Sequence, residues 1–275
     1  MKRSSSIIIR LLIASLVAIL FLLPLVYMFF TSFKNLGESM SSSKLLPIKW
    51  TAENYINLFT RTSESPILRW LLNTALVSIT GTILVVTVDL LAAFALARLN
   101  LPGKNIIIAV LIWVLSLPEI TIIFPQFYIM RSLHLVNTFF PLIFPYSAKV
   151  LGVYMLYSFL RSFPRDLEEA ALIDGASLMM TLRRIIFPSI RPSVITLAFL
   201  TFLAIYNDYL WPNLIITQDS MRTLTIGVAS LVLGSNFVNP GMMMTAVFIS
   251  TIPVLLIFLL LNRYITQGIT HSGLK

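Results

Sequence analysis

One stretch of the chain gathers polar and small residues between two long apolar runs. It reads Glu168-Glu169-Ala170-Ala171-Leu172-Ile173-Asp174-Gly175-Ala176 and is followed by two arginines and two prolines. A small pair such as Ala170-Ala171 lets a helix sit deep in a groove, and the Glu169 carboxylate can make a charge-assisted contact with a basic residue. These residue types suit docking on another protein.

The flanking residues predict two short helices joined by a bend. Pro164 and Asp166 can open the first, because proline suits a first turn and a carboxylate suits the positive end of a helix. Gly175 then permits a bend or a close backbone approach. In the second helix we expect an apolar face made by Leu178, Met179, Leu182, Ile185 and Ile186, with Arg183 and Arg184 nearer the other face. We expect Pro188 to end this helix before the next apolar run.

Periodicity leaves two interpretations of this stretch. It can be a docking element, or it can be an amphipathic helix lying on the membrane surface, for which apolar and arginine residues would serve equally well. The two are evenly matched on spacing alone.

Charged residues also lie within or at the ends of the apolar runs: Asp89, Glu119, Lys149 and Asp208. An unpaired charge in hydrocarbon costs about 3 kcal/mol or more, so each should face the bundle interior or water. They can line a transport pathway, or Lys149 can pair with Asp89 or Glu119 and fix helix packing. For these three we favour packing.

A second candidate pathway segment surrounds Asp208. It contains Tyr206, Asn207, Tyr209 and Trp211. Sugars bind through hydroxyl hydrogen bonds and by stacking on aromatic rings, which favours Tyr206, Asn207, Asp208 and Trp211 as pathway residues. An aromatic belt at the outer membrane surface explains the same residues equally well.

Several other chemistries find no support in the sequence. There is no cysteine, and His134 and His271 have no companion ligands, so no metal site is expected. Paired carboxylates, a nucleophilic triad and a phosphate-binding loop are absent, since Gly103-Lys104 lacks the other residues of that loop. We expect no catalysis and no cofactor on this chain.

Composition places the chain in a membrane. Of its 275 residues 57% are hydrophobic and 11% are charged, with a mean hydropathy of +0.90. The formal net charge of +9 comes from scattered residues, so nucleic-acid binding is not expected. Continuous apolar runs about 20 residues long favour helices, so we predict an all-α protein with six transmembrane helices. The expected spans are about 11–30, 70–97, 106–130, 139–160, 193–211 and 242–262.

The basic residues predict the orientation. Placing both termini in the cytosol puts most of the basic residues of the short loops inside, including Arg98, Lys104, Arg161, Arg165, Arg183 and Arg184. We therefore expect one permease domain over residues 1–275, with the loop 161–192 between the fourth and fifth spans in the cytosol. The first run is expected to be a retained anchor.

The polar stretch resembles the signature of ATP-binding cassette (ABC) importer permeases. The pattern E-A-A-x-x-D-G-A-x8-I-x-x-P is carried here by Glu169, Ala170, Ala171, Asp174, Gly175, Ala176, Ile185 and Pro188. The resemblance implies that the loop is a coupling helix inserted in a cytosolic ATPase dimer, which binds ATP and Mg²⁺. It favours the docking interpretation over the interfacial helix.

Shorter segments resemble the second permease subunit of maltose-type sugar importers. They include Asn73-Thr74-Ala75, Leu135-Val136-Asn137-Thr138, Tyr206 to Pro212, and the tail with Gln267, Gly268 and Lys275, which in that family reaches toward the ATPase. The loop departs from its relatives at Met179-Met180-Thr181-Leu182, which puts the details of the ATPase groove in doubt.

This resemblance implies a subunit of the bacterial cytoplasmic (inner) membrane that pairs with a homologous permease and receives sugar from an extracytoplasmic binding protein. Three alternatives remain: an importer of another solute such as a glycerol phosphate, an ion-coupled secondary carrier using Asp89, Glu119 and Lys149, and a membrane-embedded enzyme. Lys149 is the one cation in the pathway for an anionic cargo.

Overall fold

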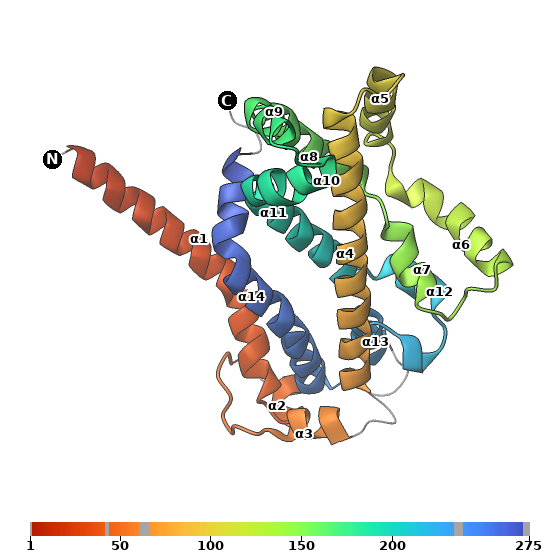
Figure 1. Ribbon diagram of the computed structural model, residues 1–275. Helices are drawn as coiled ribbons and strands as arrows, with labels where there is room; N and C mark the ends of the chain where they lie inside the picture. Colours follow the sequence, from red (N-terminus) through yellow and green to blue (C-terminus); the bar gives the residue numbers. More distant parts are fainter. Residues whose placement is uncertain (1, 42–43, 61–65, 234–238, 272–275) are drawn as a thin grey trace. The chain divides into compact units, whose positions relative to one another are not determined.

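The computed structural model describes residues 2–41, 44–60, 66–233 and 239–271, and contains helices but no strand within those ranges (Figure 1). The helices are α1 (Lys2–Ser32), α2 (Leu36–Ser41), α3 (Glu53–Thr60), α4 (Ile67–Arg98), α5 (Lys104–Val114), η1 (Glu119–Ile122), α6 (Ile123–Ser132), α7 (Phe140–Ile143), η2 (Phe144–Tyr146), α8 (Val150–Ser162), α9 (Asp166–Ile173), α10 (Leu178–Thr181), η3 (Leu182–Ile186), α11 (Phe187–Tyr206), α12 (Leu210–Ile215), η4 (Asp219–Met221), α13 (Leu224–Leu233) and α14 (Pro240–His271).

The helices confirm the prediction of an all-α polytopic protein. By length and composition, 5 helical segments of the described chain can cross a membrane, and the number is up to 6 if a bent pair counts as one span. The bent pair comprises Lys104–Val114 and Glu119–Ser132, which meet at 95°. Helix α9 lies between the fourth and fifth of these six segments, as expected.

The structure differs from the expected spans in three places, one of which lies within 139–160, where η2 ends at Tyr146 and α8 starts at Val150. The run 106–130 is broken between α5 and η1, where Pro118 precedes Glu119 in an extended conformation with ψ 125°. Proline lacks the N–H that would continue a helix, which accounts for a break at this point. The expected span 193–211 ends early, because α11 stops at Tyr206 and α12 starts at Leu210.

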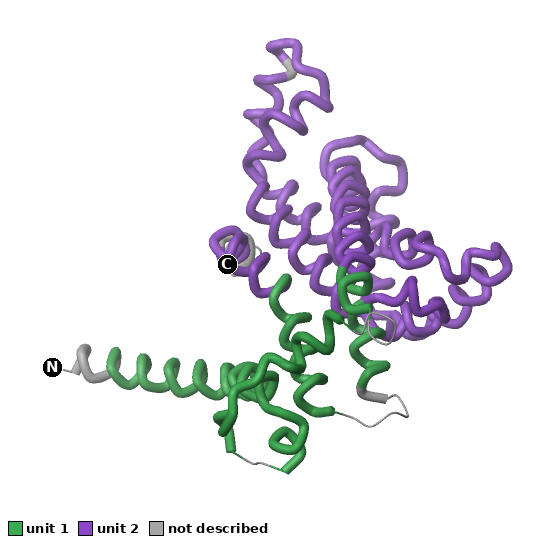
Figure 2. The backbone as a smooth tube through the Cα atoms, turned by 90° about the horizontal axis from the view of Figure 1, so that it is seen from below, with its two compact units in different colours: residues 1–71, 224–253 green, residues 72–223, 254–275 purple. Residues whose placement is uncertain are grey.

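The chain divides into two compact units, one of residues 1–71 and 224–253 and the other of residues 72–223 and 254–275 (Figure 2). In the first unit the side-chain amide of Asn54 donates hydrogen bonds to the carbonyls of Ser32 and Lys34, at 2.9 and 2.8 Å. Gly227 lies so close to the Trp70 ring that a Cβ there would collide with it. These contacts hold α3 to the end of α1, and α13 to the first turn of α4.

The second unit contains two apolar clusters. One joins the end of α4 to α8, η3 and α11, and consists of Ala93, Phe94, Leu96, Ala97, Val153, Leu156, Leu160, Leu182, Ile186, Ile190, Val194 and Leu197. The other joins the start of α4 to α6, α7, the end of α11 and α12, and consists of Val77, Ile123, Met130, Leu142, Ile205, Trp211, Ile215 and Ile216.

Two asparagines, from the segments Asn73-Thr74-Ala75 and Leu135-Val136-Asn137-Thr138, form hydrogen bonds with the loop that follows α12. Asn73 donates to the carbonyls of Ser220 and Arg222, at 3.0 and 2.9 Å. Asn137, in the left-handed region with φ 58°, accepts hydrogen bonds from the N–H groups of Thr217 and Gln218. Asparagine tolerates that backbone conformation better than most residues. Both residues therefore act by fixing backbone.

Candidate functional site

The predicted two-helix loop is present between α8 and η3. Helix α9 begins at Asp166, with the carbonyl of Arg165 accepting from the N–H groups of Glu168 and Glu169, each at 2.9 Å. It ends at Ile173. Gly175, two residues further on, has φ +84°, and the Ala176 N–H donates to the Ala171 carbonyl at 2.9 Å. This is a Schellman end, for which glycine is the preferred residue. The bend expected at Gly175 is thus a helix cap.

The second half of the loop differs from its prediction at Pro188. The helix does not end there: α10, η3 and α11 form a continuous helical segment from Leu178 to Tyr206, opened by the Ser177 hydroxyl, which accepts from the Met180 N–H at 3.3 Å. Pro188 lies in the first turn of α11, directly after the π-helical turn 182–186. Proline lacks the N–H for a helical hydrogen bond of its own, and the π-helical turn directly before it changes the hydrogen-bond register at this point.

The expected apolar face of this helix is only partly right. Leu182 and Ile186 are buried in the core with α4 and α8, but Leu178 and Met179 are 48% and 54% exposed. The helix therefore joins the spans through one part of its length and presents apolar side chains outward through another.

A buried ion pair holds α9 to the end of α4. The Arg98 guanidinium donates to both carboxylate oxygens of Glu168, from Nε at 2.8 and 2.6 Å and from Nη2 at 2.5 Å. The two side chains are only 6% and 10% exposed. A bidentate pair of this kind fixes orientation as well as distance. Glu169, the neighbouring carboxylate, is exposed.

Around this anchor, α9 and α10 present exposed apolar side chains, which we call the α9–α10 apolar surface: Leu167 at 55%, Ile173 at 85%, Leu178 at 48%, Met179 at 54% and Met180 at 42%. Of the other loop residues singled out in the sequence, Ala170, Asp174, Gly175 and Pro188 are exposed and Ala171, Ala176 and Ile185 are half-buried. Contiguous exposed apolar side chains mark a surface that another molecule covers.

The charged residues of the apolar runs come together in a second place, which we call the polar network: Asp89, Glu119, Tyr146, Lys149 and Asp208. The Lys149 Nζ donates to Glu119 Oε1 at 3.0 Å, and its ammonium lies 5.5 Å from the centre of the Tyr146 ring. The Tyr146 hydroxyl donates to Asp208 Oδ2. The pairing of Lys149 with Glu119 is one of the two that the sequence suggested.

Asp89 is paired differently from either expectation. It is fully buried, and its Oδ1 accepts from the backbone N–H of Lys149 at 3.0 Å, at the start of α8. Helix starts leave such N–H groups unbonded, so the carboxylate from α4 satisfies one of them. A Cβ on Gly152 would collide with Asp89 Oδ2, so glycine makes room for this contact.

The polar network lies where helices are interrupted. Glu119 opens η1 after the 95° bend, Lys149 precedes α8, and Asp208 follows the end of α11. Transporter binding sites are commonly built at such interruptions, because loose helix ends offer hydrogen-bonding groups inside the membrane.

The aromatic segment around Asp208 divides into covered and open residues. Tyr206 and Trp211 are buried, at 4% and 5% exposed, and the Trp211 Nε1 donates to the Pro141 carbonyl at 2.7 Å. Asn207 is exposed and Asp208 half-buried. In this conformation the Trp211 ring packs in the core and presents no face for stacking.

The sequence analysis did not select three residues that the structure makes central. Arg98, Glu168 and Tyr146 bond to partners 62 to 70 positions away. In the sequence, Arg98 is a charge at the end of an apolar run, and Glu168 directly precedes the signature. Nothing in the sequence indicated that the two side chains pair. Of the predicted tail residues, Gln267 and Gly268 are described only by their helical backbone in α14, and Lys275 lies outside the described residues.

Comparison with known proteins places this arrangement in a family. Residues 89–271 match the model of the family described as binding-protein-dependent transport system inner membrane component. The sulfoquinovosyl glycerol transport system permease protein SmoH of Agrobacterium fabrum is 33% identical, over 97% of this chain and 93% of its own length. The trehalose/maltose transport system permease protein MalG of Thermococcus litoralis is also 33% identical, over 95% and 94%.

A solved structure has the same fold. One chain of a bacterial ABC transporter involved in the import of the acidic polysaccharide alginate aligns with a TM-score of 0.81 and 18% identity, over 95% of this chain and 98% of that one. The fold, the family match and the relatives agree with the resemblance found in the sequence. The chain belongs to the binding-protein-dependent transport system inner membrane components and is a permease subunit of an ABC importer.

Proposed function

We propose that this subunit imports a sugar or oligosaccharide, as one half of a heterodimer with a homologous permease. The cargoes in the relatives' names support a carbohydrate: sulfoquinovosyl glycerol, trehalose/maltose, and diacetylchitobiose for the permease NgcG of Streptomyces coelicolor, which is 32% identical. Lys149, the cation of the polar network, pairs with Glu119 in this structure and is not free to bind an anionic cargo.

In this proposal the free energy for transport comes from ATP hydrolysis by a cytosolic ATPase dimer, which binds the ATP and Mg²⁺. In this arrangement both termini and the loop 161–192 face the cytosol, and α9 docks in a cleft of the ATPase. The observation that carries this proposal is the α9–α10 apolar surface, whose side chains are out of place in water and outside any core. Glu169, exposed beside it, is available to a basic residue of the cleft.

The loop is connected so that movement of α9 reaches the spans. The Arg98–Glu168 pair ties α9 to α4, and Leu182 and Ile186 place η3 in the core with α4, α8 and α11. Because packed cores shift between discrete arrangements and do not deform continuously, a push on α9 reorients these helices together. Nucleotide-dependent closure of the ATPase then selects one of two orientations of the permease, which is alternating access.

The cargo passes the polar network. Its carboxylates, the Tyr146 hydroxyl and the exposed Asn207 offer hydrogen-bonding groups for sugar hydroxyls at helix interruptions within otherwise apolar segments. A binding protein outside the membrane delivers the cargo to this end of the path.

The docking proposal is tested with Ile173→Asp. Ile173 is 85% exposed, so the substitution removes no internal packing, but it places a charge where the ATPase cleft would cover an apolar side chain. Burying an isoleucine contributes about 1.5–3 kcal/mol, so ATPase binding should weaken at least about tenfold. The measurement is the affinity of the purified ATPase for the permease heterodimer in nanodiscs, together with sugar uptake in cells.

Ile48→Asp is the matched control, because Ile48 is 70% exposed and lies in the segment assigned to the outside. It should bind the ATPase and transport as the unaltered protein does. Equal ATPase affinity for Ile173→Asp and Ile48→Asp would remove the docking proposal.

A further inference from the structure

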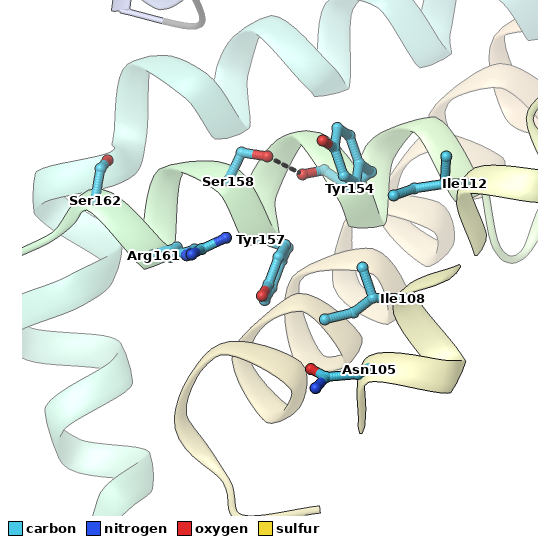
Figure 3. A pocket seen from close by; sticks show the side chains of 8 residues that line it. All are labelled: Asn105, Ile108, Ile112, Tyr154, Tyr157, Ser158, Arg161 and Ser162. Carbon is cyan, nitrogen blue, oxygen red and sulfur yellow. Dashed lines mark hydrogen bonds between the residues drawn. The ribbon is translucent and has the colours of Figure 1, made fainter. Parts of the chain in front are cut away.

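A pocket lies between α5 and α8, and none of its lining residues belongs to the α9–α10 apolar surface or to the polar network. It has a volume of about 580 Å³ and is lined by Asn105, Ile108, Ile112, Tyr154, Tyr157, Ser158, Arg161 and Ser162. Figure 3 shows the side chains of the two helices facing each other across it. We call this the α5–α8 pocket. Neither the coupling loop nor the cargo path accounts for it.

Its two ends differ in chemistry. Asn105 and Arg161 lie where α5 begins and α8 ends, and Ile112 and Tyr154 lie seven residues further into each helix, which is about 10 Å along a helix axis. We call the end at Asn105 and Arg161, which is polar and basic, the mouth of the pocket, and the apolar, aromatic end its depth. Ile112 and Tyr154 at the second end are 46% and 38% exposed, so the pocket is open there as well.

The mouth carries positive charge that the described part of the chain does not neutralise. The Arg161 side chain is exposed and forms no ion pair with a described residue, and the Lys104 ammonium lies 6.0 Å from the centre of the Tyr157 ring. None of the eight lining residues is acidic. The Ser158 and Ser162 hydroxyls donate to carbonyls of their own helix, at 2.9 and 2.8 Å. The lining donors left for a ligand are Arg161, Asn105 and the hydroxyls of Tyr154 and Tyr157, and Lys104 lies beside them.

We propose that the α5–α8 pocket binds an anionic phospholipid. The phosphate would lie at Arg161, Lys104 and Asn105. The part of the acyl chain nearest the headgroup would lie along Ile108, Ile112 and Tyr154. A guanidinium pairs with phosphate through two parallel hydrogen bonds, and basic pockets between membrane helices favour anionic headgroups. An apolar wall at acyl depth distinguishes a lipid from a soluble phosphate. The proposal is independent of the identity of the cargo.

The test is native mass spectrometry of the assembled transporter, released from vesicles of phosphatidylcholine with added phosphatidylglycerol. Removing one basic contact costs about 1 kcal/mol, so Arg161→Gln should lower retention of phosphatidylglycerol about fivefold. Arg165→Gln, an exposed arginine outside the pocket, should retain it normally. Ile108→Trp, which fills the apolar depth and leaves the charges in place, should also lower retention.

Three results would overturn the proposal. The first is equal retention of phosphatidylglycerol and phosphatidylcholine, which would show that the pocket has no preference for an anionic lipid. Inorganic phosphate can displace the bound species while Ile108→Trp has no effect, which would assign the mouth to a soluble anion. Arg161→Gln can dissociate the partner permease with no change in bound lipid, which would make the pocket part of the interface between permeases.

Discussion

At the scale of residues, adjacent glutamates in the signature have different environments. Glu168 is buried against Arg98 and has both carboxylate oxygens occupied, whereas Glu169 is exposed next to the α9–α10 apolar surface. The first is placed to hold the loop to this subunit, and the second to meet a partner. The sequence assigned a contact with a partner to Glu169, but it did not show that Glu168 faces inward, because that depends on Arg98, 70 positions away.

Glu168→Gln should therefore destabilise the permease. Removing one charge of a buried pair leaves the other uncompensated, at a cost of about 3–5 kcal/mol, so the thermal unfolding midpoint of the purified heterodimer should fall by several degrees. Glu169→Gln should leave that midpoint unchanged and weaken ATPase binding. Arg98→Met combined with Glu168→Met should recover part of the lost stability, because no buried charge remains. Equal midpoints for the two glutamine variants would contradict the anchoring role of Glu168.

At the scale of elements, the interruptions of helices were the hardest features to predict. Hydropathy correctly identified the run 106–130 as apolar, but it does not indicate where a helix axis changes direction. The 95° bend after α5 was therefore not predicted, although Pro118 lies at that point. At Pro188 the sequence predicted the end of a helix, but the helix continues there. A proline that ends one helix and a proline in the first turn of another look alike in sequence. The Schellman end at Gly175 was predictable, because a positive φ after a short helix favours glycine.

These interruptions matter because the polar network is built on them. Asp208→Asn removes the charge that accepts from the Tyr146 hydroxyl, between the end of α11 and η2. Hydrogen bonds to a charged group contribute about 1.5–3 kcal/mol, so sugar uptake by the reconstituted transporter should fall about tenfold or more. Assembly with the partner permease and the ATPase should persist, as judged by size-exclusion chromatography.

Asp219→Asn is the matched control for that experiment. Asp219 pairs with Arg222 at 2.8 Å, and the Asp219 side chain is 73% exposed. Because exposed ion pairs contribute little to stability, sugar uptake should stay close to that of the unaltered protein. If Asp208→Asn transports sugar at the same rate as Asp219→Asn, the polar network is a packing device and the cargo takes another path.

At the scale of the whole molecule, the number and order of the membrane segments could be read from composition, because spanning helices need long apolar runs whatever surrounds them. Of the contacts between runs, the sequence suggested the pairing of Lys149 with Glu119 but not that of Tyr146 with Asp208, which lie 62 positions apart. The direction of the chain through the membrane rests on the distribution of basic residues, and it decides whether α9 faces an ATPase at all. It is also simple to measure, because the chain has no cysteine and any introduced thiol is unique.

Ser132→Cys and Asn100→Cys place such thiols on opposite sides of the proposed topology. Ser132 is exposed at the end of α6, in a loop assigned to the outside, and Asn100 is exposed between α4 and α5, in a loop assigned to the cytosol. A membrane-impermeant maleimide added to spheroplasts should label Ser132→Cys at once and Asn100→Cys only after the membrane is opened, because the basic residues flanking Asn100, Arg98 and Lys104, favour the cytosolic side. The reverse labelling pattern would place α9 outside the cell, where no ATPase could drive it.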